Sequence, residues 1–230
     1  MKHMLRFAMV LGLFILLTLA EACVSFPENR PKAENFPKTG AGSPQSVAMR
    51  VAISSFTNEK EKETTYRAEV TDKLVQALDR QIADDAFGGL SHQEAALLFT
   101  ARVFKRADGA KSFKLLKPDE IVEADRTYDV SMEFNGGYKG FTKALFYISA
   151  FTATIVPYTA KQSLRMKVSV LDHSGGITNN YDSVERMNVW AGIVFLPVRP
   201  FVSGYSEGFL DMVANLNSTI LDRMKADRLF

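Results

Sequence analysis

The sequence predicts an α+β fold, or a mixed α/β sandwich, in which an early helix and a C-terminal helix pack on a mostly antiparallel sheet. Several segments alternate apolar and polar residues, which is the pattern of half-buried strands. Two longer segments repeat apolar residues every three to four positions, which is the pattern of helices with one buried face. Residues 47–230 are enough for one sizeable core, so we expect a single domain there.

Four segments show the two-residue period, and each is expected to be a strand: 47–56, 125–134, 164–171 and 177–186. The sequence Asp-His-Ser-Gly-Gly at 172–176 lies between the last two strands. Its turn-forming residues predict a tight reversal of the chain, so that 177–186 returns as the partner of 164–171.

Helical periodicity predicts helices over 65–83 and 205–225. In the first, apolar residues recur every four positions from Val70 to Ile82, and the second carries a similar apolar stripe. We expect both helices to cover the sheet, because each has one apolar face to bury.

A further helix is expected to be short. Ser91 and Glu94 have the spacing of a capping box, which favours a helix over 95–99. The overlapping segment 97–104 is also compatible with a strand, and the sequence leaves both interpretations open.

The first 22 residues have the pattern of an export signal. Lys2 and Arg6 supply a basic start, 7–19 is an uninterrupted apolar run, and Ala-Glu-Ala at 20–22 resembles a cleavage site. Cys23 follows directly and is the single cysteine of the chain. This placement favours an exported bacterial protein that carries a lipid on Cys23.

The residues around the cysteine resemble the lipobox of bacterial prolipoproteins. Ala22 and Cys23 match its last two positions, whereas the charged Glu21 departs from it. The resemblance implies a diacylglycerol on Cys23 as the membrane anchor, and Val24 in the next position favours the outer membrane. Two alternatives remain: simple secretion after Ala22, or retention of 7–19 as an anchor, although that run is short for a span of about 20 residues.

Residues 23–46 are expected to be the lipidated cysteine followed by a flexible tether. This segment holds Pro27, Pro31, Pro37 and Pro44 together with mixed charges, and it shows no apolar periodicity.

Two charge-free apolar runs, 144–160 and 187–198, do not fit an ordinary surface. They are interpreted as buried core, as a hairpin that dips into a membrane, or as a contact between copies of the chain. A joint role is preferred, because the runs flank the predicted hairpin. The candidate membrane or oligomer contacts are Phe146, Tyr147, Phe151, Ile155, Tyr158, Trp190 and Phe195.

The sequence gives no support for catalysis, a cofactor or a metal. Asp172, His173 and Ser174 are the residue types of a hydrolase triad, but adjacent residues cannot converge their side chains. Histidine and cysteine do not cluster at the spacing of metal ligands. The net charge of +2 with no basic stripe argues against nucleic-acid binding.

The order of the predicted elements is similar to that of bacterial envelope lipoproteins, including the curli-secretion lipoprotein and the activators of penicillin-binding proteins. The matching segments are VAISSF at 51–56, LVQALDRQI at 74–82, TYDVSMEF at 127–134 and LRMKVSVLDHSGG at 164–176. The resemblance transfers no functional residue except Cys23.

We therefore expect an outer-membrane lipoprotein facing the periplasm, which acts as a non-enzymatic accessory or assembly factor with a protein partner or with itself. The alternative function is that of an oligomer that inserts 144–160 into the membrane, and an envelope hydrolase is the least favoured hypothesis.

Overall fold

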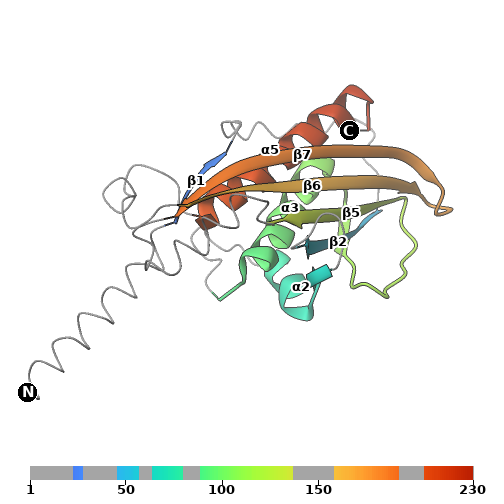
Figure 1. Cartoon of the computed structure of the whole chain (residues 1–230). Helices are drawn as coiled ribbons and strands as arrows, with labels where there is room; N and C mark the ends of the chain where they lie inside the picture. Colours follow the sequence, from blue (N-terminus) through green and yellow to red (C-terminus); the bar gives the residue numbers. More distant parts are fainter. Residues whose placement is uncertain are drawn as a thin grey trace, which may run out of the picture.

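A mixed sheet forms one layer of the computed structural model, and helices cover one of its faces (Figure 1). The structure describes residues 23–27, 46–56, 64–79, 89–136, 158–191 and 205–229. Within these ranges the sheet has seven strands in the order β1-β7-β6-β5-β2-β3, and β4 also pairs with β2. The strands are β1 (Cys23–Pro27), β2 (Ser46–Phe56), β3 (Thr64–Glu69), β4 (Ser112–Leu115), β5 (Arg126–Asn135), β6 (Tyr158–Asp172) and β7 (Ile177–Ala191).

Most neighbouring strands of this sheet run antiparallel, as the sequence predicts. The exceptions are the pairings of β2 with β5 and with β4, which are parallel. β4 and β3 share the outer side of β2, with β4 beside its first residues and β3 beside its last. The combination of this sheet with separate helices makes the fold α+β.

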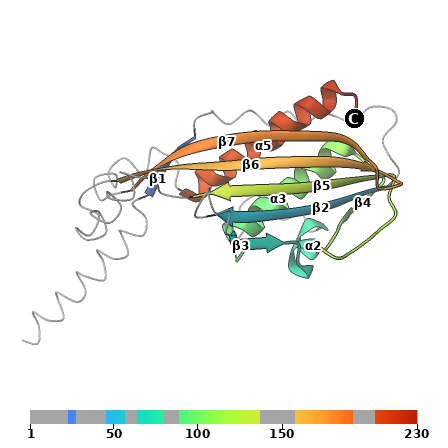
Figure 2. The ribbon, with the colours of Figure 1, turned by 45° about the vertical axis from the view of Figure 1, so that its right-hand side comes forward.

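The helices are α2 (Asp72–Asp79), α3 (His92–Asp108) and α5 (Tyr205–Ala226). α3 and α5 lie behind the sheet in Figure 2 and bury its apolar face. Edge-to-face aromatic contacts join the two layers, with ring centroids 5.2 Å apart for Phe104 and Tyr128 and 5.4 Å apart for Phe134 and Phe209.

The predicted strand and hairpin pattern is confirmed. Along β5 the side chains of Tyr128, Val130 and Met132 are buried, whereas those between them face solvent. The turn after β6 is built on the Asp172 carboxylate, whose Oδ1 accepts hydrogen bonds from the backbone N–H groups of Ser174 and Gly176, both at 2.9 Å. The C-terminal helix also has the predicted position.

The expected helix over 65–83 is wrong in its first part. Residues 64–69 form β3, which pairs antiparallel with β2, and the helix begins only at Asp72. Tyr66 and the β-branched Thr65 suit a strand, and the edge of β2 supplies hydrogen-bond partners that an isolated segment lacks. Leu74 and Leu78 are buried as the helical stripe predicts, while Ile82 lies outside the described residues.

The capping box at Ser91 is confirmed, but the helix it starts is longer than predicted. Ser91 Oγ accepts from the Glu94 N–H at 3.2 Å, and the Glu94 carboxylate accepts from the Ser91 N–H at 2.7 Å. The helix continues to Asp108 and ends at Gly109, which has a left-handed φ of 62°. The alternative strand over 97–104 is therefore wrong, because these residues are helical and belong to α3, which packs against β2 and α5.

The expected flexible tether is contradicted for its first residues, because Cys23–Pro27 form β1 at the edge of β7. α5 holds this strand in place. A Cβ atom at Gly208 would lie 2.6 Å from Cβ of Ser25, so the absence of a side chain at 208 allows the strand and helix to approach. Ser25 is buried in this contact. Residues 28–45, the rest of the predicted tether, lie outside the described residues.

Candidate membrane-facing end of the sheet

The first residue of β1 lies at the same end of the sheet as both apolar runs. Cys23 is the register partner of Ala191, the last residue of β7, and Ala191 is the partner of Tyr158, the first residue of β6. The run at 144–160 therefore enters β6 beside Cys23, and the run at 187–198 leaves β7 there. Figure 1 shows β1 at this end of the long β6–β7 hairpin.

The inner sides of the two runs belong to the core where the structure describes them. Ala160 of β6 and Met187 and Val189 of β7 are buried against the helices. For these residues the interpretation as buried strand is confirmed, and its cause is the alternation of the two strands. Residues 144–157 and 192–198 lie outside the described part of the chain.

The side chain of Trp190 lies on the face of the sheet opposite to Met187 and Val189, and it is 39% exposed. Its register partners are Thr159 on β6 and Val24 on β1, so it lies one position from the Cys23 end of the sheet. Among the predicted contact residues, it is the one whose side chain the structure describes. Tyr158 is described as part of the β6 backbone, and the others, Phe146, Tyr147, Phe151, Ile155 and Phe195, lie outside the described residues.

The starts of α3 and α5 meet near this end. Ser206 Oγ lies 2.6 Å from Nε2 of His92, and both residues belong to the first turns of their helices. Sequence analysis missed this pair, because the two residues are 114 positions apart and no motif in the sequence relates them. The hydrogen bond joins the two helices that cover the sheet. One turn further along α5, burial raises the pKa of the Asp211 carboxyl, and the neighbouring charge of Glu207 adds to the rise.

The residues that resemble a hydrolase triad lie at the opposite end of the β6–β7 hairpin. The Asp172 carboxylate is occupied by the turn, and its hydrogen bond from the Ser174 hydroxyl at 2.6 Å is the main cause of its lowered pKa. His173 is exposed in the same turn. The arrangement is that of a structural turn, as the sequence predicts.

A buried polar cluster that the sequence analysis missed joins α3, β5 and the C-terminal segment. The Tyr128 hydroxyl donates to Oδ2 of Asp108, and Arg126 donates to the same oxygen at 3.2 Å and to the backbone oxygen of Leu229 at 2.8 Å. Oδ1 of Asp108 is buried without a hydrogen-bond partner among the described residues. Burial raises the pKa of this carboxyl, and the hydrogen bond from Tyr128 and the charge of Arg126 oppose the rise.

In the described ranges no group of three or more histidine, cysteine or acidic residues could hold a metal ion. In the same ranges, none of the helices has the length and apolar character required to cross a membrane.

No protein-family model matches the chain, and no curated protein matches it. Among solved structures, the chain is similar to a PelC dodecamer from Paraburkholderia phytofirmans, with 12% identity and a TM-score of 0.33, over 86% of this chain and 95% of that one. A point variant of the same PelC dodecamer matches with 13% identity and a TM-score of 0.31, over 86% of this chain and 98% of that one. Likenesses of this strength carry no argument about function.

Proposed function

We propose that this protein is a lipoprotein of the bacterial cell envelope, anchored by a lipid on Cys23 in the outer membrane, facing the periplasm. Its role is that of a non-enzymatic accessory or assembly factor that acts through protein contacts. One observation carries the proposal: the cysteine that follows the export signal is also the first residue of β1, at the end of the sheet that both apolar runs share.

In this arrangement a lipid on Cys23 would set the orientation of the domain at the membrane. A lipid on Cys23 connects to the sheet without a spacer, so the domain is held with the β1 end toward the bilayer. A mature lipoprotein with two or more acyl chains binds membranes stably, whereas one chain gives only marginal binding. Trp190 then lies at the level where aromatic side chains favour the membrane interface.

The edge of β7 supports a role in protein contacts. β1 pairs with β7 over Met187–Ala191 only, and in the described ranges no strand pairs with the outer edge of 177–186. Arg223 of α5 donates to the backbone oxygen of Asp182 at 2.8 Å and covers part of this edge. Uncovered edges are sites at which a further strand can add through backbone hydrogen bonds.

A second candidate function is an oligomer that inserts the 144–160 segment into the membrane. The observation that favours it is the shared position of Cys23, Tyr158 and Ala191, because a segment that leaves the sheet there starts next to the proposed bilayer. Self-association would then supply partners for polar groups that lipid cannot satisfy.

The two candidates are separated by removing the lipid. The full chain is compared with a Cys23→Ser variant and with a form whose signal is replaced by one cut before Val24, so that an unlipidated domain enters the periplasm. Mass spectrometry of the N-terminal peptide should find a thioether-linked diacylglycerol in the full chain only. A domain that becomes soluble without the lipid supports the accessory role, and one that remains in the membrane fraction supports insertion. An unmodified Cys23 in the full chain would overturn the proposal.

A further inference from the structure

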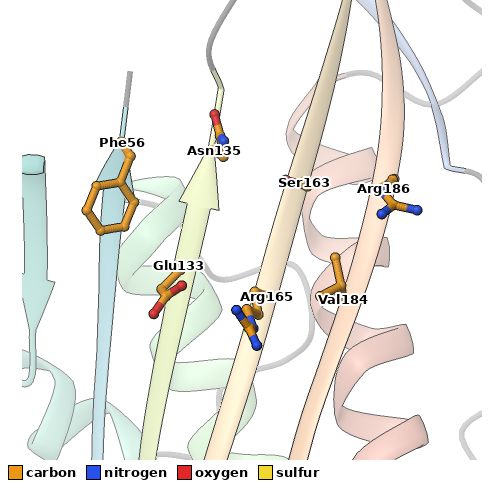
Figure 3. Close-up of a pocket in the computed structure, with 7 residues that line it drawn as sticks. All are labelled: Phe56, Glu133, Asn135, Ser163, Arg165, Val184 and Arg186. Carbon is orange, nitrogen blue, oxygen red and sulfur yellow. The ribbon is translucent and has the colours of Figure 1, made fainter. Parts of the chain in front are cut away.

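The face of the sheet opposite α3 and α5 holds a pocket of about 360 Å³ near the Cys23 end (Figure 3). Toward the other end of the sheet the loop after β4 packs over this face, where Leu116 and Ala124 bury Ala48. The pocket lies beyond that loop and crosses four strands. The described residues that line it are Phe56, Glu133, Asn135, Ser163, Arg165, Val184 and Arg186.

Four of these residues form one continuous row across the sheet. Phe56 of β2 pairs with Asn135 of β5, Asn135 pairs with Ser163 of β6, and Ser163 pairs with Arg186 of β7. Three strand spacings of about 4.8 Å make the row roughly 14 Å long. An aromatic ring therefore stands at one end and a guanidinium at the other, with an amide and a hydroxyl between them (Figure 3).

Of the three charged side chains among the described residues that line the pocket, two are paired. Glu133 accepts from Nζ of Lys167 at 2.7 Å, and Nε of Arg165 donates to the two carboxylate oxygens of Asp182 at 2.9 and 3.0 Å. Arg186 has no ion pair with any residue of the described ranges, and it is exposed. Among the described lining residues, Arg186 is therefore the one charge without an opposite partner, and it lies at the end of the row.

The side chains that line the pocket favour one class of anionic ligand, a saccharide, over another, a peptide. Proteins bind peptides by adding them to a strand edge, by seating an apolar helix in a groove, by docking polyproline between aromatic side chains, by holding acidic motifs with clusters of arginines, or by capturing a chain terminus in backbone nests. A cluster of free arginines is not found among the described lining residues, because Arg165 is paired with Asp182 and Arg186 stands alone. Here the backbone groups of the row are occupied by sheet pairing, and the pocket offers one ring with polar groups in line. This lining fits a ligand that is rich in hydroxyl groups, has an apolar ring face and bears a carboxylate for the guanidinium.

We propose that this pocket is a binding site for an acidic saccharide, in which Arg186 binds a sugar carboxylate, Asn135 and Ser163 bind hydroxyl groups, and Phe56 packs against a sugar ring. The site is built on rigid sheet positions and does not depend on the lipid at Cys23. Its affinity is expected to be modest, because the pocket is open to solvent on the sheet face.

The test is calorimetric titration of the mature lipoprotein, purified in detergent, with the trisaccharide of galacturonic acid. Maltotriose serves as the neutral probe and tri-glutamate as the acidic peptide probe. Arg186→Gln removes the charge in the pocket. Lys161→Gln is the matched control, since Lys161 is an exposed cation on the same face of β6 that does not line the pocket. Phe56→Leu tests the ring.

We expect saturable binding of the acidic trisaccharide, a loss of roughly tenfold or more in Arg186→Gln, and a smaller loss in Phe56→Leu, because a charge-assisted bidentate contact is the strongest in the row. Lys161→Gln should retain the affinity of the native chain. Equal losses in the two charge variants would mean nonspecific attraction and would overturn the proposal. Equal affinity for maltotriose would overturn the proposed contact between Arg186 and a sugar carboxylate, because maltotriose has no carboxylate. Tighter binding of tri-glutamate would overturn the saccharide as the ligand and would favour an acidic peptide.

Discussion

Gly208 of α5 faces Ser25 of β1 so closely that a Cβ atom at position 208 would lie 2.6 Å from the Cβ of Ser25. This contact fixes the first described strand to the helix layer. Because β1 begins at Cys23, the same contact determines where the proposed lipid meets the folded domain. The proposed attachment of the domain to the membrane would therefore depend on Gly208, which lies far from Cys23 in the sequence.

Replacement of Gly208 by alanine should dislodge β1. Overpacking of a close contact costs about 1–3 kcal/mol, which exceeds the gain of up to about 1 kcal/mol that alanine brings to a helix interior. The midpoint of urea unfolding should fall, and backbone amides of β1 should exchange faster with deuterium. The double variant with Ser25→Gly should recover most of the loss, because it removes the atoms that alanine meets. Equal stability of Gly208→Ala and the native chain would refute the close contact.

Replacement of Tyr128 by phenylalanine should destabilise the fold by about 1–3 kcal/mol near neutral pH. The variant removes a hydrogen bond to the buried Asp108 carboxylate, whose other oxygen already lacks a partner among the described residues. Tyr181→Phe is the matched control. The Tyr181 hydroxyl donates at 2.7 Å to the exposed Asp227, so its loss should cost less than about 1 kcal/mol.

The same cluster predicts the pH dependence of stability. Burial raises the pKa of Asp108, so the folded chain holds this proton at pH values where the unfolded chain has released it. Stability should therefore fall as pH rises from the unfolded value, near 3.8, through the raised folded value. In the native chain the hydrogen bond from Tyr128 lowers the pKa of Asp108. Tyr128→Phe removes this bond and raises the pKa further, so the fall in stability should extend to higher pH. Urea unfolding across a pH series measures both slopes, and identical profiles for the two chains would contradict the assignment.

Replacement of Ser91 by alanine should cost about 1 kcal/mol, because Ser91 Oγ caps the start of α3. Ser91→Asp should retain most of the stability, since aspartate is also a good N-cap. The Ser91 backbone N–H lowers the pKa of Glu94, so this contribution to stability is lost as pH falls through the folded value. The loss of stability at acid pH should persist in Ser91→Ala, which keeps the backbone N–H, and should disappear in Glu94→Gln, which has no carboxylate to protonate. Thermal unfolding at several pH values measures both.

Local patterns in the sequence account for the central strands, the hairpin turn and the C-terminal helix. Alternation identifies β5 because Tyr128, Val130 and Met132 are buried on one face, and Asp172 forms the turn through bonds to residues next to it. The capping box likewise predicts where α3 begins, since Ser91 and Glu94 bond to each other. These features depend on neighbours in the chain and are therefore visible in it.

The features that the sequence does not reveal depend on distant partners. β1 is a strand because β7 offers a free edge and Gly208 makes room, and neither condition is visible around Cys23. Asp108 lies beyond the short helix that the sequence predicts over 95–99, and no local pattern predicts its burial against Tyr128. The row of pocket residues is set by the register of four strands, so Phe56 and Arg186 become related only when the sheet forms.

Trp190 provides a direct test of the proposed orientation at the membrane. It is the single tryptophan of the chain, it is 39% exposed, and its register partner Val24 follows Cys23. If the chain is lipidated as proposed and its β1 end faces the bilayer, insertion of the protein into vesicles should shift Trp190 emission to shorter wavelength, and lipids brominated near the headgroup should quench it. The physical reason is transfer of the indole from water to the membrane interface, which tryptophan favours.

The control for this prediction moves the indole to the opposite end of the same strand. In Trp190→Phe combined with Ile177→Trp, the new indole replaces an exposed residue, 61% accessible, beside the hairpin turn. Thirteen positions along an extended strand separate the two sites by roughly 40 Å, which exceeds the reach of contact quenching. The brominated lipids should therefore leave this variant almost unquenched. Equal quenching of the two proteins would mean that the sheet lies flat on the membrane, and quenching of neither would place the β1 end away from it.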